Sequence, residues 1–191
     1  MLKASPEIDR SVREGQFMQP RSCLSFAVTL SVAVLFVAAA MAGQLAKEGS
    51  YTATVFKDGT FKDYPVGNNL HLDLWDEVGQ SIGTGLLDHM TWHCFGVKQV
   101  LNGISETPHG YCVGTDADGD QIAFVVASER YASNASTHRG LGTSITGTGK
   151  YAGISTDYTF ACENEGAPIY TEGTFERYRH KCTIKGNYKL L

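Results

Sequence analysis

The order of apolar and polar residues divides the chain into one long apolar run and an alternating remainder. No charged residue occurs from Ser22 to Ala46, and the segment Leu24–Ala42 is almost entirely Leu, Val, Ala, Phe and Ser. After Ala46, helical periodicity is hard to find, and stretches rich in β-branched and aromatic residues recur between Gly, Asp and Asn. The pattern predicts an N-terminal apolar segment followed by a domain built of strands.

About eight strands are expected in this domain. We place them at residues 51–56, 69–75, 86–97, 111–115, 121–126, 141–146, 155–163 and 174–189, with a turn at 57–60 and a polar loop at 127–140. Few of the gaps are long enough for crossover helices. The pattern is therefore typical of an antiparallel sandwich or of a closed up-and-down barrel.

Residue parity within the expected strands indicates which side chains share a face. In strand 69–75, Leu70, Leu72 and Leu74 alternate with His71, Asp73 and Trp75. One face of strand 86–97 carries Met90, Trp92 and Cys94, and one face of strand 155–163 carries Tyr158, Phe160 and Cys162. In strand 174–189, the face with Tyr178, His180, Cys182 and Ile184 lies opposite the face with Arg177, Arg179 and Lys181. Three cysteines thus accompany aromatic residues. We expect these aromatic faces to point inward and the charged residues to coat the outside.

The apolar run resembles an export signal. The Ala40-Met41-Ala42 triplet fits a signal-peptidase site, and a start at Met18 would leave a short positive region ending at Arg21. Residues 1–42 are then a signal peptide with a possible N-terminal extension, and residues 43–191 form the mature domain. Cys23 is removed together with the signal peptide. An uncleaved membrane anchor is the alternative, because the run is long enough to span a bilayer.

Four cysteines remain in the mature domain, at positions 94, 112, 162 and 182. In an exported periplasmic or extracellular protein, two disulfides are the default expectation, with three possible connectivities. Cys94 with Cys112, and Cys162 with Cys182, would each bridge neighbouring strands. Four free buried thiols are the alternative.

The segment Gly147–Ile154, followed by Tyr158-Thr159-Phe160, resembles a pattern of the allene oxide cyclase/dirigent-like barrels, in which a Gly-rich turn with a buried aromatic residue precedes a long barrel strand. The resemblance implies a single antiparallel up-and-down barrel of about eight strands with a central cavity. It also implies a role on small apolar molecules. Tyr151 is then most simply a core residue, and the glycines suit tight backbone conformations.

Three functions are compatible with such a barrel. It could bind a small apolar ligand, act as a cyclase or isomerase in the same cavity, or serve as a structural envelope protein with a filled interior. The expected pocket lining is Trp92, Tyr158, Phe160, Tyr178 and His180. The mature domain carries 12 Lys and Arg against 17 Asp and Glu, an acidic balance that argues against nucleic acid as a partner.

Two acidic or histidine-containing segments are candidate metal sites with simpler explanations. Asp116–Asp120 has three alternating carboxylates that suit Ca²⁺, but Asp-Gly is also a strong hairpin turn signal, which we favour. His89 and His93 lie about 13 Å apart along a regular strand, too far for one ion.

Asn134-Ala135-Ser136 is a glycosylation sequon. No phosphate-binding loop or nucleophile elbow occurs, and no cofactor is expected.

Overall fold

The computed structural model describes residues 45–106, 108–166, 169–170 and 175–191, so the predicted signal peptide lies outside the described residues. None of the helices in these ranges is long and apolar enough to span a membrane. The elements are β1 Glu48–Val66, β2 Leu70–Thr84, the 3₁₀ turn η1 Gly85–Leu87, β3 Thr91–Leu101, β4 Ile104–Ser105, β5 His109–Thr115, β6 Gln121–Ser128, β7 Tyr131–Ala132, β8 Thr137–Gly147, the 3₁₀ turn η2 Gly149–Tyr151, β9 Ile154–Asn164, β10 Ile169–Tyr170 and β11 Phe175–Leu190.

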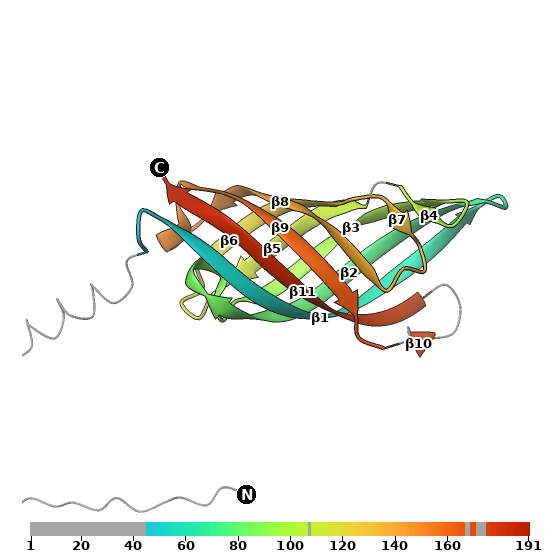
Figure 1. Ribbon diagram of the computed structural model, residues 1–191, viewed down its shortest axis with the longest axis horizontal. Coiled ribbons are helices and arrows are strands. Elements are labelled where there is room, and N and C mark those ends of the chain that lie inside the picture. Colours follow the sequence, from blue (N-terminus) through green and yellow to red (C-terminus); the bar gives the residue numbers. More distant parts are fainter. Residues whose placement is uncertain (1–44, 107, 167–168, 171–174) are drawn as a thin grey trace, which may run out of the picture. The chain divides into compact units, whose positions relative to one another are not determined.

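Eight of these strands form a closed barrel (Figure 1). Each long strand pairs antiparallel with the next one along the chain, in the order β1, β2, β3, β5, β6, β8, β9, β11, and β11 pairs with β1 to complete the circle. The short strands β4 and β7 pair with each other, and β10 pairs with β11. The up-and-down barrel expected from the sequence is confirmed, and a sandwich is excluded.

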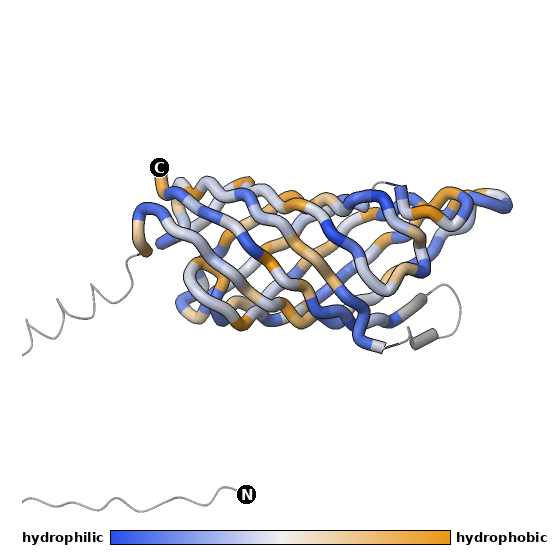
Figure 2. Tube along the Cα trace, viewed as in Figure 1, coloured by the Kyte–Doolittle hydropathy of each residue, from blue (hydrophilic) through white to orange (hydrophobic). Residues whose placement is uncertain are grey.

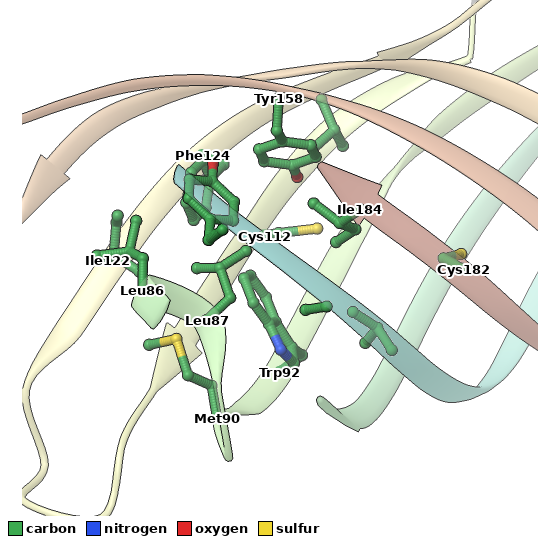
Figure 3. Packing of buried hydrophobic residues seen from close by; sticks show 14 of the residues in the cluster. Leu86, Leu87, Met90, Trp92, Cys112, Ile122, Phe124, Tyr158, Cys182 and Ile184 are labelled. Carbon is green, nitrogen blue, oxygen red and sulfur yellow. The ribbon is translucent and has the colours of Figure 1, made fainter. Parts of the chain in front are cut away.

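One end of the barrel is packed solid. The β2–β3 and β8–β9 connections at this end contain η1 and η2, and Leu86, Leu87 and Tyr151 from these turns are buried. They contact aromatic and aliphatic side chains from the strands, including Trp92 and Phe124, in a single apolar cluster (Figure 3). The 3₁₀ turns thus close this end of the interior.

The inward and outward faces of β9 and β11 are as predicted. Tyr158, Cys162, His180 and Cys182 are buried, whereas the charged residues between them face outward. The alternation of apolar and polar positions along these strands is visible in Figure 2. Closing the sheet into a barrel buries one face of every strand, so the period of two decides which side chains form the interior.

Strand β2 departs from the expected orientation. Its leucines face solvent, with Leu72 44% and Leu74 47% exposed, whereas Asp73 and Glu77 are buried inside the barrel. The expectation that charged residues coat the outside is therefore wrong for this strand. The outer surface of six neighbouring strands correspondingly exposes large apolar side chains: Phe56, Tyr64 and Val66 of β1, Leu72, Leu74, Val78 and Ile82 of β2, Phe95, Val97 and Leu101 of β3, Tyr111 of β5, Val125 of β6, and Leu141 and Ile145 of β8.

Three predicted boundaries are also corrected. Residues 57–60 do not turn: β1 continues through them, because all four residues pair with both β2 and β11. The predicted strand 86–97 starts only at Thr91, after η1. The polar stretch 127–140 is shorter as a loop than expected, since β6 extends to Ser128 and β8 begins at Thr137.

The two predicted disulfides are present. Cys94 faces Cys112 across the β3–β5 ladder, and Cys162 faces Cys182 across the β9–β11 ladder, with 4.0 Å between the Cα atoms in each pair. All four residues point into the barrel. Each bridge therefore links two adjacent strands inside the barrel.

Candidate functional site

The end of the barrel opposite η1 and η2 contains a cavity of about 910 Å³. Its walls come from the inward faces of the eight barrel strands, and its mouth from the β1–β2, β3–β5, β6–β8 and β9–β11 connections. Aromatic side chains provide much of the lining: Phe61, Trp75, Tyr131, Tyr158, Phe160 and Tyr178. The barrel is thus filled at one end and hollow at the other.

The sequence-predicted pocket residues divide between these two ends. Tyr158, Phe160, Tyr178 and His180 line the cavity. Trp92 lies instead in the packed cluster, 4% exposed, with its ring against Phe124. A role in ligand binding stays a prediction for the four residues that line the cavity, whereas Trp92 packs in the apolar core.

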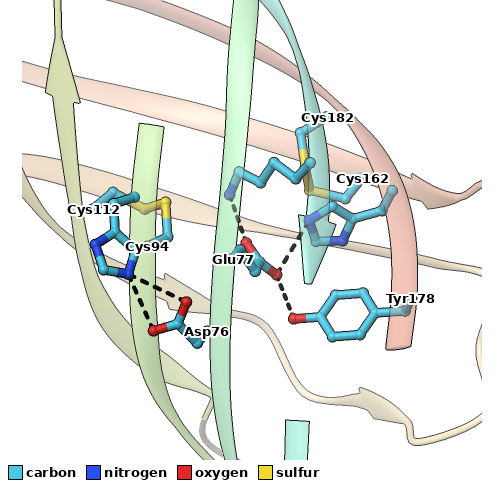
Figure 4. The surroundings of a disulfide bond; sticks show 10 residues. Asp76, Glu77, Cys94, Cys112, Cys162, Tyr178 and Cys182 are labelled. Atoms are coloured by element: carbon cyan, nitrogen blue, oxygen red, sulfur yellow. Dashed lines mark hydrogen bonds and ion pairs between the residues drawn. A yellow bond between two sulfur atoms is a disulfide. The ribbon is translucent and has the colours of Figure 1, made fainter. Parts of the chain in front are cut away.

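A buried carboxylate forms the polar centre of the cavity wall. Glu77 Oε2 accepts a hydrogen bond from Lys57 Nζ at 2.9 Å, and Oε1 accepts one from the Tyr178 hydroxyl at 2.7 Å. His180 Nε2 lies 3.2 Å from Oε1. Figure 4 shows Glu77 and Tyr178 pointing toward each other near the Cys162–Cys182 disulfide. Three strands, β1, β2 and β11, therefore contribute to one polar cluster, which we call the Glu77 cluster: Lys57, Glu77, Tyr178 and His180.

The surroundings of Glu77 keep it ionised. Burial raises the pKa of this carboxyl, but Lys57, His180 and the Tyr178 hydroxyl outweigh burial and hold the pKa well below its usual range. Burial and the facing carboxylate raise the pKa of Tyr178 well above its ordinary value. The cluster therefore presents a carboxylate and a protonated phenol at neutral pH.

Two further pairs of ionisable side chains lie in the same wall. Lys98 Nζ is 3.0 Å from Asp73 Oδ2, with side chains 13% and 7% exposed, and His71 Nδ1 is 2.9 Å from Asp63 Oδ2 nearer the mouth. Burial raises the pKa of Asp73 above its usual value. Sequence reasoning missed Lys57, Glu77, Asp73 and Lys98 as interior residues. Their strand parity carried a signal, because Asp73 and Trp75 alternate with the leucines of β2.

His138 of β8 was also missed. Its ring stacks on Tyr131, with centroids 5.1 Å apart, and lies 5.6 Å from the ring of His180. Burial lowers the pKa of His138 to about 4, and the nearby His180 contributes in the same direction. His138 is therefore a neutral imidazole at pH 7, located at the cavity wall.

A group of potential metal ligands lies beside the Glu77 cluster. One ligand atom each from His138, Cys162 and His180 lies within 4.8 Å of the other two. In this form Cys162 is bonded to Cys182, and a disulfide sulfur has none of the negative charge with which a thiolate binds metal. The histidines are thus the ligands available in the disulfide form.

The two metal candidates considered from the sequence are located elsewhere. Asp116–Asp120 forms the predicted hairpin turn, in which the Asp116 carboxylate accepts the N–H groups of Asp118 and Asp120 and pairs with Lys150 Nζ at 2.8 Å. His89 precedes β3 and pairs with Asp88. His93 lies on the outer face beside Asp76, separate from the cavity.

Comparison with known proteins yields no match among family models, curated sequences or solved structures. The class is therefore defined by the architecture alone: a disulfide-linked, closed, eight-stranded antiparallel barrel with a polar cluster in a half-open interior.

Proposed function

We propose that the barrel binds one small, largely apolar molecule in its open half. The observation that carries the proposal is the cavity of about 910 Å³, whose lining combines six aromatic side chains with paired charged groups and other polar residues. Ligand sites commonly have volumes of roughly 300–1,000 Å³ and combine apolar walls with a few converging polar groups. A purely structural protein would be expected to have a completely filled barrel, and this half of the interior is not filled.

The charges in the cavity favour an uncharged ligand with one hydrogen-bonding group. Lys57 is paired with Glu77, and Lys98 with Asp73, so the wall carries little net charge for an ion to neutralise. A carbonyl or hydroxyl group near the Glu77 cluster would find donors and an acceptor already oriented, which lowers the cost of ordering on binding. The aromatic rings would hold the apolar remainder.

We assign the mature domain, residues 43–191, to an exported location and to an allene oxide cyclase/dirigent-like type of barrel. Two disulfides suit an oxidising compartment, the apolar Leu24–Ala42 run suits a signal peptide, and the Gly147–Ile154 turn precedes a barrel strand as the resemblance implies. Tyr151 of this turn is buried in the core.

Titration with N-phenyl-1-naphthylamine, an uncharged dye that fluoresces in apolar surroundings, tests ligand binding. We expect saturation at one dye per barrel and at least about fivefold weaker binding in Phe160→Ala, since roughly 1 kcal/mol of apolar contact would be lost. Phe95→Ala is the matched control because Phe95 lies on the outer face, 44% exposed. Unsaturable binding, or equal losses in both variants, would contradict a cavity site.

An isomerase or cyclase acting in the same cavity is a second candidate. It is favoured by the convergence of ionisable groups from three strands in the Glu77 cluster, since the Tyr178 phenol can polarise a carbonyl or epoxide oxygen once its hydrogen bond is transferred from Glu77 to the substrate. Racemic apolar epoxides and enones, analysed by chiral chromatography, test it. Product enriched in one enantiomer by the wild type and lost in Tyr178→Phe supports catalysis; racemic product throughout leaves only binding.

A further inference from the structure

We propose that the dithiol form of the barrel binds one zinc ion through Cys162, Cys182, His138 and His180, so that the disulfide between β9 and β11 gates a metal site in the cavity wall. The first support is register. His138 of β8 faces Cys162 of β9, which faces Cys182 of β11. His180 precedes Cys182 by two positions and shares its inward face.

Distances and burial agree with a closed four-ligand site. The nearest ligand atoms of His138, Cys162 and His180 all lie within 4.8 Å of one another, and Cys162, Cys182 and His180 are at most 4% exposed. In tetrahedral zinc with Zn–S bonds of about 2.3 Å, two sulfurs are about 3.8 Å apart. Cysteines that face each other across a ladder reach this separation once the S–S bond is broken.

The surroundings also suit a zinc-bound histidine. Nε2 of His180 has no well-aligned hydrogen bond, although Glu77 Oε1 lies 3.2 Å away. A carboxylate beside the second ring nitrogen of a ligating histidine is the usual outer-shell partner of zinc, and it orients the ring. Glu77, in turn held by Lys57 and Tyr178, would play that part.

The chemistry is balanced with a thiol reductant. Two reductant thiols transfer two electrons and two protons to the Cys162–Cys182 bond, which gives two cysteine thiols and the oxidised disulfide of the reductant. Zinc then binds the two sulfurs as thiolates, and two protons are released. Reoxidation would expel the metal, because the disulfide offers no thiolate.

The other disulfide is a matched control within the same chain. Cys94 and Cys112 also face each other inside the barrel, but their register neighbours on β2 and β6 are Glu77 and Phe124, and among the described residues the group of three potential metal ligands lies at the other bridge. A Cys94→Ala/Cys112→Ala variant retains the proposed ligand set. A Cys162→Ala/Cys182→Ala variant removes half of it.

Cobalt(II) titration of the reduced protein, followed by zinc displacement, tests the proposal. We expect one equivalent of cobalt with intense tetrahedral d–d bands and a thiolate-to-cobalt charge-transfer band in the wild type and in Cys94→Ala/Cys112→Ala. Neither should appear in the oxidised wild type or in Cys162→Ala/Cys182→Ala, and His138→Ala, which keeps both thiolates, should bind cobalt more weakly and with altered bands. His138→Ala changes a half-buried residue, so circular dichroism should show that it still folds.

Three outcomes would overturn the proposal. These are cobalt bands of equal strength in the Cys162→Ala/Cys182→Ala variant, pale octahedral spectra in the reduced wild type, or an unaltered spectrum in His138→Ala. Should reduction unfold the chain, zinc must restore the folded circular dichroism spectrum, and failure to do so also refutes the site. Dye binding to the cavity of the oxidised protein is measured separately and does not depend on the result.

Discussion

At the scale of single residues, the interior charges are the main departure from a simple apolar core. Glu77 is buried, and three polar groups from two other strands surround it. A buried ion pair contributes little net stability compared with apolar residues of the same shape, but removing one partner leaves the other desolvated and unpaired. Such a pair therefore constrains how β1, β2 and β11 meet.

This reasoning predicts strong coupling between Lys57 and Glu77. Each single variant, Lys57→Met or Glu77→Gln, should lower the free energy of unfolding by about 3–5 kcal/mol, because it leaves one buried charge. The double variant should be less destabilised than the sum of the two. Chemical denaturation of all four proteins measures the coupling, and simple additivity would contradict it. Lys181→Met with Glu163→Gln, an outer pair, is the control and should show about 1 kcal/mol or less.

The Asp116 turn predicts a specific pH dependence. Burial raises the pKa of Asp116, but hydrogen bonds from Lys150, Tyr151 and two backbone N–H groups outweigh it, so the pKa lies below the usual 3.8. A depressed folded-state pKa gives stability that is complete above the unfolded-state value and lost as the pH falls through the folded-state value. Asp116→Asn should therefore cost about 1–3 kcal/mol at neutral pH.

The difference between wild type and Asp116→Asn should shrink as the pH falls below the usual carboxyl pKa of 3.8, because the stabilised carboxylate is then progressively protonated. Urea denaturation at neutral pH and at a series of acidic pH values measures the difference. A constant difference would show that the charge of Asp116 does not stabilise the turn. Asp118→Asn is a suitable control, because the Asp118 side chain is 70% exposed.

At the scale of elements, two disulfides and the close contact of Gly59 in β1 with Tyr178 in β11 help to hold neighbouring strands together. The bridges span 18 and 20 residues and link neighbours in the meander, β3 with β5 and β9 with β11. The β1–β11 closure has no bridge. It depends on register and on Gly59, where a Cβ atom would come within 2.5 Å of the Tyr178 ring.

Removing either disulfide should therefore have a similar effect. Loops of this length predict a loss of about 2–4 kcal/mol for Cys94→Ala/Cys112→Ala and for Cys162→Ala/Cys182→Ala in metal-free buffer. Guanidinium denaturation measures both losses against the oxidised wild type. Denaturation midpoints unchanged in either variant would contradict a stabilising role for that bridge.

Gly59→Ala should destabilise the β1–β11 closure by about 1–3 kcal/mol, because the added methyl displaces the Tyr178 ring. It should also weaken the Tyr178–Glu77 hydrogen bond. Thermal melts measure the stability. Thr60→Ala, at the next and exposed position, is the control, and equal melting temperatures for the two variants would refute the argument.

At the scale of the whole barrel, stability and the candidate site lie at opposite ends. The packed end contains the apolar cluster beneath η1 and η2, and the open end contains the cavity with its charge pairs. On the outside, β1, β2, β3, β5, β6 and β8 expose large apolar side chains, whereas the outer faces of β9 and β11 carry charged residues. The barrel is thus asymmetric both along its axis and around it.

Substitutions at the two ends should separate stability from binding. Leu87→Ala, in the packed end and 0% exposed, should cost about 2–5 kcal/mol without changing dye affinity. Phe160→Ala should weaken dye binding while costing less than about 2 kcal/mol of stability, since it borders an existing cavity. Thermal melts and dye titrations on both variants test this, and a shared loss of both properties would contradict it.

The sequence alone indicated an all-β domain of about eight strands and made two disulfides the default expectation, whereas strand pairing decided the barrel over the sandwich and the connectivity of the cysteines. These predictions used local signals: alternation with a period of two, turn residues, and the parity of the cysteines on β9 and β11. A local signal does not depend on which strands pair with one another. The position of Tyr151 in the core was expected from the Gly-rich turn that contains it and is confirmed by its burial.

Only the tertiary structure decided which face of β2 points inward, that 57–60 continues a strand, and that Trp92 belongs to the packed end. Alternation along β2 separates two faces without saying which one is buried. Closure of the sheet brings Glu77 within hydrogen-bonding distance of Lys57 and Tyr178. These partners stabilise the buried carboxylate, which from its own strand alone would be expected to face solvent. The division of the interior into packed and hollow ends likewise follows from how side chains far apart in the chain fill a common space, which no single segment encodes.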